Sequence, residues 1–308
     1  MTPFFSVVIP VYNRAHLIAE TLQSVLMQTE QDFEIVVVDD GSKDDPEAVI
    51  KEIGDPRIVF IRQENGGGGA ARNTGIDHAR GRFIAFLDSD DQFLPHHLAD
   101  MRALLEGTKN KGAYSRFIVD RGHGRALLKP PRAIREDENM AVYLLCDRGF
   151  LATSTIVVPA DLARKIRFNE NLPAAEDTDF AIRAALAGTR FLMAKTPSMI
   201  WRDWADPNRL SSGRRCESML DWIDGLRPAI PEKAYYGCLG WAYAKYVAMS
   251  APGQALKLYL QAVMRGCYQP SLAVIVFLQI FLPDGAYRKV ADHAIALLGR
   301  VWDARAKA

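Results

Sequence analysis

Four apolar runs, each ending in polar or glycine-rich residues, most constrain how this 308-residue chain folds. The runs cover residues 5–11, 33–38, 57–62 and 83–87. Continuous apolar runs of this length are typical of strands that are buried on both faces of a parallel sheet. Helical patterns with short connections lie between the runs. We therefore expect a doubly wound α/β domain in which the strand ends share one edge of the sheet.

The later part of the chain continues this alternation less regularly. Residues 121–135, which are rich in glycine and proline, read as a loop. From Cys216 onward the pattern is entirely helical. Pro10 is expected to end the first strand, because proline cannot donate to a β-ladder. Further strands are expected at residues 112–120, 155–158 and 190–194, and helices at residues 98–105, 139–146 and 160–165.

The fourth apolar run ends in three closely spaced carboxylates, Asp88, Asp90 and Asp91. Carboxylates this close repel one another unless a cation or strong donors lie among them. Mg²⁺ binds through one or two carboxylates plus substrate phosphates, and ligands of open α/β sheets bind at the carboxyl ends of strands. The pattern thus predicts a metal and phosphate site. The alternative is a solvated acidic turn that caps a helix.

Two other strand ends carry candidate binding residues. Asp39 and Asp40 either cap a turn, or one accepts a hydrogen bond from a nucleobase while the other braces the loop. The four glycines at residues 66–69 either form a flexible turn or approach a phosphate at the next helix N-terminus. Neither nucleotide fingerprint fits, because Ala71 replaces the third glycine of Gly-x-Gly-x-x-Gly and no Gly-Lys-Ser/Thr follows. Arg72 could reach a pyrophosphate.

Glu176 and Asp177 begin another predicted helix. Acidic residues at a helix N-terminus interact favourably with the helix dipole, which is the simpler interpretation. A carboxylate that faces a cleft from a helix start can also take the proton from an acceptor hydroxyl group.

Charge and cysteine usage exclude several classes of protein. The formal net charge of +1 gives no bias toward nucleic acid. Four cysteines without a Cys-x-x-Cys pair suit free thiols in a reducing compartment better than a disulfide framework or a zinc site. No Lys or Arg precedes Arg14, so we expect no signal peptide and a cytoplasmic protein.

Five motifs occur in order along the chain: Ser-Val-Val-Ile-Pro-Val-Tyr-Asn-Arg at residues 6–14, Val-Asp-Asp-Gly-Ser at 38–42, Gly-Ala-Ala-Arg-Asn-Thr-Gly at 69–75, Phe-Leu-Asp-Ser-Asp-Asp at 86–91, and Glu-Asp at 176–177. Together they resemble family-2 glycosyltransferases, over about residues 4–212. The resemblance implies the GT-A fold, a Rossmann-like and mostly parallel sheet flanked by helices. It also implies an inverting enzyme that uses a nucleotide-sugar donor with Mn²⁺ or Mg²⁺.

The resemblance assigns roles to individual residues. Asp177 is the catalytic base, and Asp90 ligates the metal ion on the diphosphate. Asp40 contacts the nucleobase, Asp88 contacts the ribose, and Glu176 orients the base or contacts the acceptor. The wider nucleotide-binding set adds residues from the other motifs, namely Pro10 and Tyr12, which line the base pocket, with Arg14, Arg72 and Ser89.

The chain departs from the family pattern after the base. Many relatives carry a histidine in a Tyr-Arg-x-His-like stretch, which reads Trp201-Arg-Asp-Trp204 here. We expect Arg202 to take its place. The expected function is transfer of a sugar, with UDP-sugar as the favoured donor, to a saccharide or lipid-linked acceptor in surface polysaccharide or glycoconjugate synthesis. A nucleotidyltransferase on a related sheet and a non-catalytic nucleotide-sugar-binding subunit are the alternatives.

The last hundred or so residues match no motif, so we expect a catalytic domain over residues 1–213 and a C-terminal helical region over 214–308. Residues 271–282 are apolar except for Gln279. Eleven helical residues rise about 16 Å, about half of a ~30 Å hydrocarbon core, so a membrane span is excluded. We expect residues 272–282 to be largely buried. The alternative is a peripheral contact of these helices with the inner face of the membrane.

Overall fold

The computed structural model describes residues 2–122, 126–172, 174–203, 217–283 and 285–287. The chain divides into two compact units, and each is described by itself. The expected boundary at residues 213 and 214 lies outside the described residues. The second unit also takes in two earlier segments that lie within the expected catalytic domain. Unit 1 comprises Met1–Ala133, Phe150–Asn171 and Ala175–Ala205, and unit 2 comprises Ile134–Gly149, Leu172–Ala174 and Asp206–Ala308.

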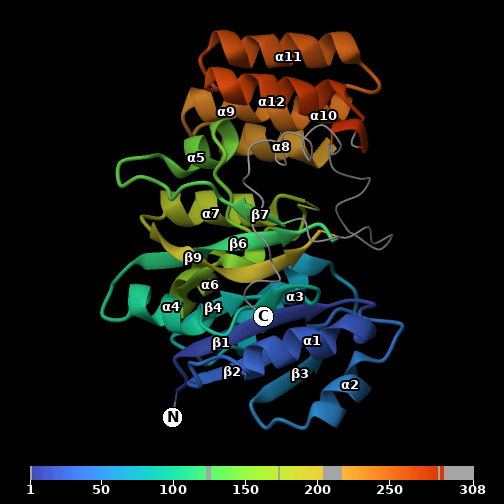
Figure 1. Ribbon diagram of the computed structural model, residues 1–308, viewed down its shortest axis with the longest axis vertical. Coiled ribbons are helices and arrows are strands. Elements are labelled where there is room, and N and C mark those ends of the chain that lie inside the picture. The colour runs from blue at the N-terminus through green and yellow to red at the C-terminus, as the bar shows by residue number, and fades with distance from the viewer. Residues whose placement is uncertain (1, 123–125, 173, 204–216, 284, 288–308) are drawn as a thin grey trace. The chain divides into compact units, whose positions relative to one another are not determined.

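Unit 1 is built on one sheet whose strand order is β3-β2-β1-β4-β8-β6-β9-β5, with β7 paired to β6 (Figure 1). The four N-terminal strands are parallel, as expected, and the remaining strands add antiparallel pairs and the parallel pair of β6 with β9. The strands are β1 Phe5–Val11, β2 Phe33–Asp39, β3 Ile58–Arg62, β4 Phe83–Phe86, β5 Gln92–Phe93, β6 Lys111–Asp120, β7 Ala126–Lys129, β8 Val157–Pro159 and β9 Arg190–Arg202.

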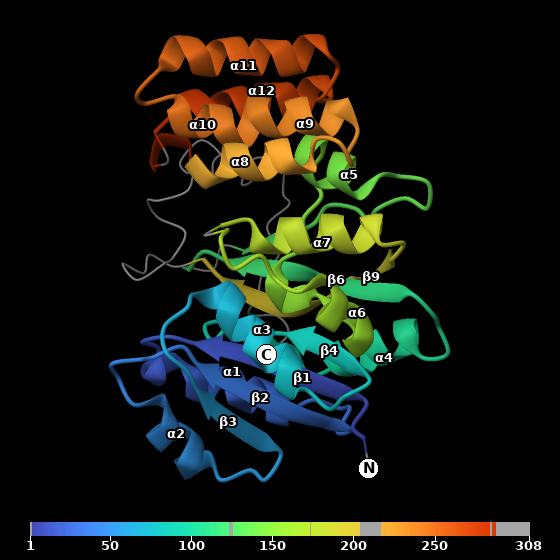
Figure 2. The same cartoon turned by 180° about the vertical axis from the view of Figure 1, so that it is seen from behind.

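Helices cover both faces of the parallel strands (Figures 1 and 2). On one face lie α1 Ala15–Leu26, α2 Pro46–Ile53 and α4 His97–Leu105. On the other face, α3 Gly68–His78 packs on β1 so closely that a Cβ on Gly75 would meet Val8 Cγ1 at 2.3 Å. This second face also carries α6 Ala160–Ile166 and α7 Glu176–Leu186, and Phe180 of α7 contacts Phe86 with ring centroids 5.7 Å apart.

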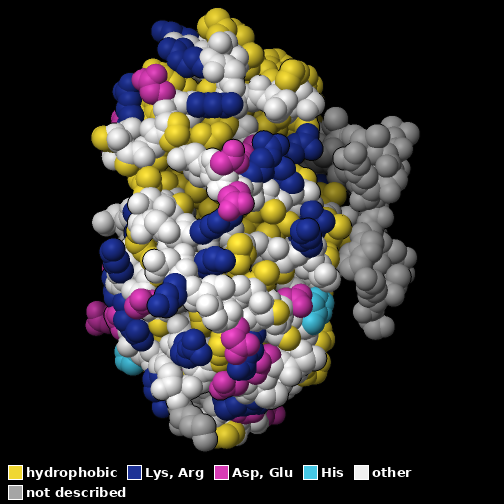
Figure 3. All heavy atoms as spheres, turned by 90° about the vertical axis from the view of Figure 1, so that its left-hand side faces the viewer, with side chains coloured by type: hydrophobic (Ala, Val, Ile, Leu, Met, Phe, Trp, Pro, Cys, Tyr) yellow, Lys and Arg dark blue, Asp and Glu magenta, His cyan; other side chains and the backbone are white. Residues whose placement is uncertain are grey.

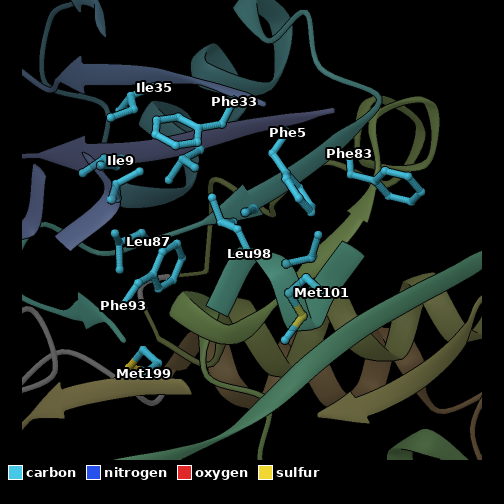
Figure 4. Packing of buried hydrophobic residues seen from close by; sticks show 14 of the residues in the cluster. Phe5, Ile9, Phe33, Ile35, Phe83, Leu87, Phe93, Leu98, Met101 and Met199 are labelled. Carbon is cyan, nitrogen blue, oxygen red and sulfur yellow. The ribbon is translucent and has the colours of Figure 1, made fainter. Parts of the chain in front are cut away.

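The main core of unit 1 lies between the sheet and the α1, α2 and α4 face. Alternate residues of β1 and β2, such as Phe5, Ile9 and Ile35, point into it, as the strand period of two requires (Figure 4). Leu98 and Met101 of α4 meet them from the helix side (Figure 4). The apolar runs read from the sequence therefore supply the core directly.

Several details of the sheet differ from the sequence-based expectation. Pro10 does not end β1 but lies within it, opposite Val38 of β2. Its nitrogen faces the β4 side, where β1 pairs with β4 only as far as Val8, so no ladder bond is lost. Residues 126–129, expected in a loop, form β7 against β6. Strand β9 continues to Arg202 because a register shift beside Pro197 absorbs that proline.

Unit 2 is helical, as expected, across its described residues. Its helices are α5 Met140–Cys146, α8 Glu217–Leu226, α9 Glu232–Cys238, the π-helical turn Leu239–Tyr243, α10 Ala244–Val247, α11 Pro252–Met264 and α12 Pro270–Phe281 (Figure 1). In α12 one face is buried through Leu272, Val276 and Ile280, whereas Val274 and Phe277 are exposed. The prediction that this segment is largely buried is therefore right for one face only. Among the described residues, no helix is long and apolar enough to cross a membrane.

Candidate functional site

The loops that follow β1 and β2 are tied together at the carboxyl edge of the sheet. Asn13 donates its backbone N–H to Ser42 Oγ at 2.9 Å, and its Oδ1 accepts from Lys43 N at 2.8 Å. Asn13 has a φ of 52°, in the left-handed region that asparagine tolerates better than most residues. Tyr12, expected at the base pocket, lies in this loop with 37% of its side chain exposed, so its ring is accessible.

Asp40 holds the glycine-rich loop. Its Oδ1 accepts hydrogen bonds from Gln63 Nε2 at 2.8 Å and from Gly66 N at 2.9 Å, and its Oδ2 accepts from Gly67 N at 2.8 Å. The backbone N–H groups of Gly66 and Gly67 therefore donate to Asp40 in this structure rather than pointing toward a phosphate site. Asp40 Oδ2 keeps one further acceptor position, which leaves the expected nucleobase contact open.

Asp39 is fully buried and braces its own turn. Its Oδ1 accepts from Ser42 N at 2.9 Å, and its Oδ2 lies 3.4 Å from Arg62 Nε. The sequence left two interpretations for this pair of acids, a bracing role and a nucleobase contact. In the structure both acids brace loops, and the bonds of Asp39 are entirely internal.

Of the three aspartates in the acidic turn after β4, Asp91 has a structural role, whereas Asp88 and Asp90 are less buried. Asp91 is buried, where its Oδ2 accepts a 2.5 Å hydrogen bond from Ser154 Oγ and its Oδ1 accepts a 3.4 Å bond from Arg202 N. Burial, followed by the charges of Asp90 and Asp88, raises the pKa of Asp91 well above its ordinary value. Thr21 Oγ1 of α1 donates to the carbonyls of Ser89 and Asp91 at 3.0 Å and fixes the turn.

Asp88 and Asp90 each pair with an arginine. Asp90 bonds Arg14, which directly precedes α1, and Asp88 Oδ1 accepts from Arg72 Nη2 at 2.6 Å. Burial raises the pKa of Asp90, and the charge of Asp88 adds to this, while Arg14 opposes it. Arg14 and Arg72, which belong to two other motifs, are thus both brought to the acidic turn.

Arg72 joins the acidic turn to the start of α7. Its Nη1 donates to Glu176 Oε2 at 2.6 Å while its Nη2 holds Asp88. Burial alone would lower the pKa of Arg72, but the charges of Asp88 and Glu176 outweigh it and hold the pKa above its ordinary value. The expected contact of Arg72 with a pyrophosphate stays a prediction, because both terminal nitrogens bond carboxylates here.

The glycines before Arg72 allow this approach. A Cβ on Gly68 would lie 3.2 Å from Arg72 Nη1, and one on Gly69 would lie 3.4 Å from Glu176 Oε1. Their small size therefore serves the close contact between the start of α3 and Glu176.

Asp177 is the second residue of α7. Its Oδ1 accepts from Thr178 N at 2.7 Å, and the preceding Ala175 has a φ of 63°. Burial raises the pKa of Asp177 to about 6, with Glu176 and Asp88 adding to the rise and Thr178 N and Arg72 opposing it. A carboxylate with this pKa is mostly ionised near neutral pH, and it accepts a proton more readily than an ordinary carboxylate does.

Three buried polar residues, to which no role is assigned from the sequence, support the site. Asn73 bonds the carbonyl of Phe168 at 3.0 Å and Glu170 Oε1 at 2.7 Å, which fixes the segment before α7. Thr21 and Ser154 hold the acidic turn. Only Asn73 lay within a motif; Thr21 and Ser154 carry no local signal that could have revealed them.

Arg202, the expected substitute for histidine, lies at the end of β9. Its guanidinium bonds Glu20 of α1, and its backbone N–H bonds Asp91. The neighbouring Trp201 stacks on Phe150 with ring centroids 5.7 Å apart. Arg202 therefore lies beside the acidic turn, and its role in place of the histidine stays a prediction. Trp204 lies outside the described residues.

The acidic turn suits a divalent cation only when a bound substrate supplies further ligands. No group of three or more His, Cys, Asp or Glu among the described residues is arranged to hold a metal ion. Asp88 Oδ2 and Asp90 Oδ1, however, make no hydrogen bond to another described residue. These hard oxygen donors on two mutually repelling carboxylates suit Mg²⁺ or Mn²⁺ when substrate phosphates complete the coordination.

Comparison with known sequences agrees with this geometry. Residues 6–166 match the profile described as Glycosyl transferase family 2. The amylovoran biosynthesis glycosyltransferase AmsB of Erwinia amylovora is 30% identical over 243 residues, which cover 75% of this chain and 80% of AmsB. An uncharacterized glycosyltransferase of Rickettsia felis is 35% identical over 185 residues, 58% of this chain but only 30% of that protein.

Solved structures show the same fold. The S. aureus TarS fragment 1–349 in complex with UDP-GlcNAc superimposes with a TM-score of 0.66 at 21% identity, covering 89% of this chain and 86% of that one. The mannosyltransferase PcManGT from Pyrobaculum calidifontis, in complex with GDP-Man and Mn²⁺, gives a TM-score of 0.53 at 20% identity, with 91% and 86% covered.

Proposed function

The chain belongs to glycosyl transferase family 2, and we propose that it moves a sugar from a nucleoside diphosphate donor to a hydroxyl group with inversion at the anomeric carbon. The observation that carries the proposal is the link from the acidic turn through Arg72 to Glu176, next to Asp177. It couples the residues proposed for the donor with the residue proposed as base. The likeness to the amylovoran biosynthesis glycosyltransferase AmsB supports a role in polysaccharide or glycoconjugate synthesis.

The proposed reaction is a single displacement. The acceptor hydroxyl oxygen attacks the anomeric carbon while its proton passes to an oxygen of Asp177. The bond between the anomeric carbon and the diphosphate oxygen breaks, and its electron pair leaves with the nucleoside diphosphate. Because attack and departure occur on opposite faces, the configuration inverts. Base assistance of this kind contributes about 10²–10⁴-fold to the rate.

We assign the residues that bind the sugar donor from their positions at the carboxyl edge of the sheet. Asp40 and Tyr12 are assigned to the nucleobase, with Pro10 behind them, and Asp88 and Ser89 to the ribose side. Arg14 and Arg72 would exchange part of their bonding to Asp90 and Asp88 for the diphosphate. A divalent cation held by Asp90, with Asp88 beside it, would offset the negative charge of the leaving diphosphate. A UDP-sugar is the favoured donor, and a GDP-sugar is the second choice.

We also propose a cytoplasmic location. The described cysteines Cys146, Cys238 and Cys267 are free and buried, which suits a reducing compartment.

Thermal unfolding across a panel of UDP-, GDP-, ADP-, CDP- and TDP-sugars, with and without Mn²⁺ or Mg²⁺, tests the proposal. One nucleotide class should raise the melting temperature by several degrees, and the metal should enlarge the shift. Incubation with that donor should then release the nucleoside diphosphate. Release of pyrophosphate would indicate a nucleotidyltransferase, and binding without any release would indicate a non-catalytic binding subunit.

A further inference from the structure

Helix α11 of unit 2 carries an apolar stripe on its exposed side. Leu256, Leu260 and Met264 are spaced four residues apart and are 41%, 44% and 77% exposed. Residues at this spacing lie on one helix face. The opposite face of α11 is buried through Ala255, Tyr259 and Ala262. The exposed stripe is therefore additional to the apolar face that builds the core of the unit.

Helix α12 extends this apolar surface. Val274 is 61% exposed and Phe277 is 40% exposed. Phe277 contacts Tyr259 of α11 with ring centroids 5.6 Å apart, and Tyr259 Oη donates to the carbonyl of Ala273 at 3.0 Å. The two helices thus lie side by side. We name Leu256, Leu260, Met264, Val274 and Phe277 the apolar face. Hydrophobic side chains gather at the upper end of Figure 3, where α11 and α12 lie in Figure 1.

The charges of this segment have one sign. From residue 237 to residue 283 the sequence holds no Asp or Glu, although the whole chain holds 37 of them. The same segment contains Lys245, Lys257 and Arg265. A protein partner with an apolar binding site would not require the absence of acids over so long a stretch. An anionic surface would, because each carboxylate near it is repelled.

We propose that the apolar face docks on an anionic membrane surface, with α11 and α12 lying in the plane of the interface. No described helix is able to span a membrane. The combination of exposed Leu, Met, Val and Phe side chains with nearby Lys and Arg is the pattern of an interfacial helix. The inference goes beyond sugar transfer and does not rest on it, because vesicle binding is read without turnover.

Vesicle flotation tests this proposal with the full chain. Wild type should float with vesicles of phosphatidylcholine and phosphatidylglycerol, float less with phosphatidylcholine alone, and partly detach at high salt. Leu260→Ser with Met264→Ser should weaken binding about tenfold or more, since two large apolar side chains no longer enter the interface. Lys257→Gln should weaken binding to the anionic vesicles alone.

Met27→Ser is the matched control, because Met27 of unit 1 is also an exposed methionine, with 64% exposure. It should leave flotation unchanged, and all variants should keep the wild-type melting temperature. The proposal is overturned if wild type does not float, or if the double variant floats as well as wild type. It is also overturned if light scattering without vesicles shows a dimer that the double variant converts to monomer, since a second copy would then cover the face.

Discussion

Asp177 is a carboxylate whose burial works against the folded state at neutral pH. Its pKa of about 6 lies above the ordinary value of 3.8, so the folded protein binds its proton more tightly than the unfolded chain does. The stability that Asp177 contributes is therefore complete below about pH 4 and is lost as the pH rises through 6. A catalytic base with a raised pKa therefore lowers the stability of the folded enzyme at neutral pH, while it makes the carboxylate a stronger proton acceptor.

This gives a prediction with a definite sign. Asp177→Asn should have the same free energy of unfolding as wild type near pH 4, yet be more stable at pH 8 by about 1–3 kcal/mol, because the amide is never charged. Urea unfolding at both pH values measures this difference. A variant that was less stable than wild type at pH 8 would show that the carboxylate mainly caps α7.

The same pKa predicts the pH dependence of the reaction. Turnover should rise with pH and reach half of its plateau near pH 6, since only the ionised Asp177 accepts the proton. Measuring kcat between pH 4.5 and 8.5 tests this. A rate that did not vary across this range would assign the base to another group.

Asp90 is the acidic residue proposed to bind the metal ion, and it makes a separate prediction. Asp90→Asn should remove the metal-dependent part of nucleoside diphosphate binding, because one of the two available oxygen donors loses its charge. Calorimetry with and without Mn²⁺ measures this, and Asp100→Asn, at a half-buried position in the first turn of α4, is the control. Unchanged metal-dependent binding in Asp90→Asn would contradict the assignment.

At the scale of elements, the site depends on how α3, β4 and α7 are fixed to one another. Arg72 of α3 bonds Asp88 after β4 and Glu176 of α7, so one buried guanidinium sets the position of the helix start that carries Asp177. Ala175, with its positive φ, makes the sharp entry into this helix. We infer that Glu176 positions Asp177 rather than reacting itself.

Glu176→Gln should therefore keep the fold but lower kcat by about tenfold or more, while donor binding changes little. The amide removes the charge that holds Arg72, and a shift of the base by a fraction of an ångström reduces the rate steeply. Comparing kcat with the donor KM measures this. If KM rose and kcat stayed the same, Glu176 would act in donor binding.

The elements that the sequence predicted are those whose signal is local. The buried runs of β1, β2 and β4 are continuous and apolar, and the carboxylates that follow β4 stand directly at its end. Strand β7 was missed because its four residues lie between glycines and a Pro-Pro pair, and only pairing with β6 makes them a strand. The extension of β9 past Pro197 likewise depends on a register shift that no local pattern announces.

The structure brings several residues of the separate motifs together, but the bonds between them could not be predicted from the sequence. The motifs named Arg72, Asp88 and Glu176 separately, yet nothing in their spacing showed that Arg72 would hold both acids. Asp40 was expected at a nucleobase and is found holding Gly66 and Gly67. Interactions between residues far apart in the chain are set by tertiary contact, which periodicity and composition do not encode.

At the scale of the whole molecule, the packing of unit 2 buries one face of helix α12 and leaves another face exposed. Val276 is fully buried in α12, whereas Val274, two residues earlier, is 61% exposed. Val276→Asp should destabilise the protein by several kcal/mol, because an unpaired charge would enter the core. Val274→Asp should leave the melting temperature almost unchanged, and equal losses in both variants would contradict the described packing of α12.

The central claim, an inverting displacement with Asp177 as base, is tested most directly by the first anomer that the enzyme releases. With water as the acceptor and an α-linked donor chosen from the panel, proton NMR at early times should show the β-anomer of the free sugar. Asp177→Asn should bind the same donor and release almost none. Early appearance of the α-anomer, or β-anomer formed by the variant at the wild-type rate, would contradict the account.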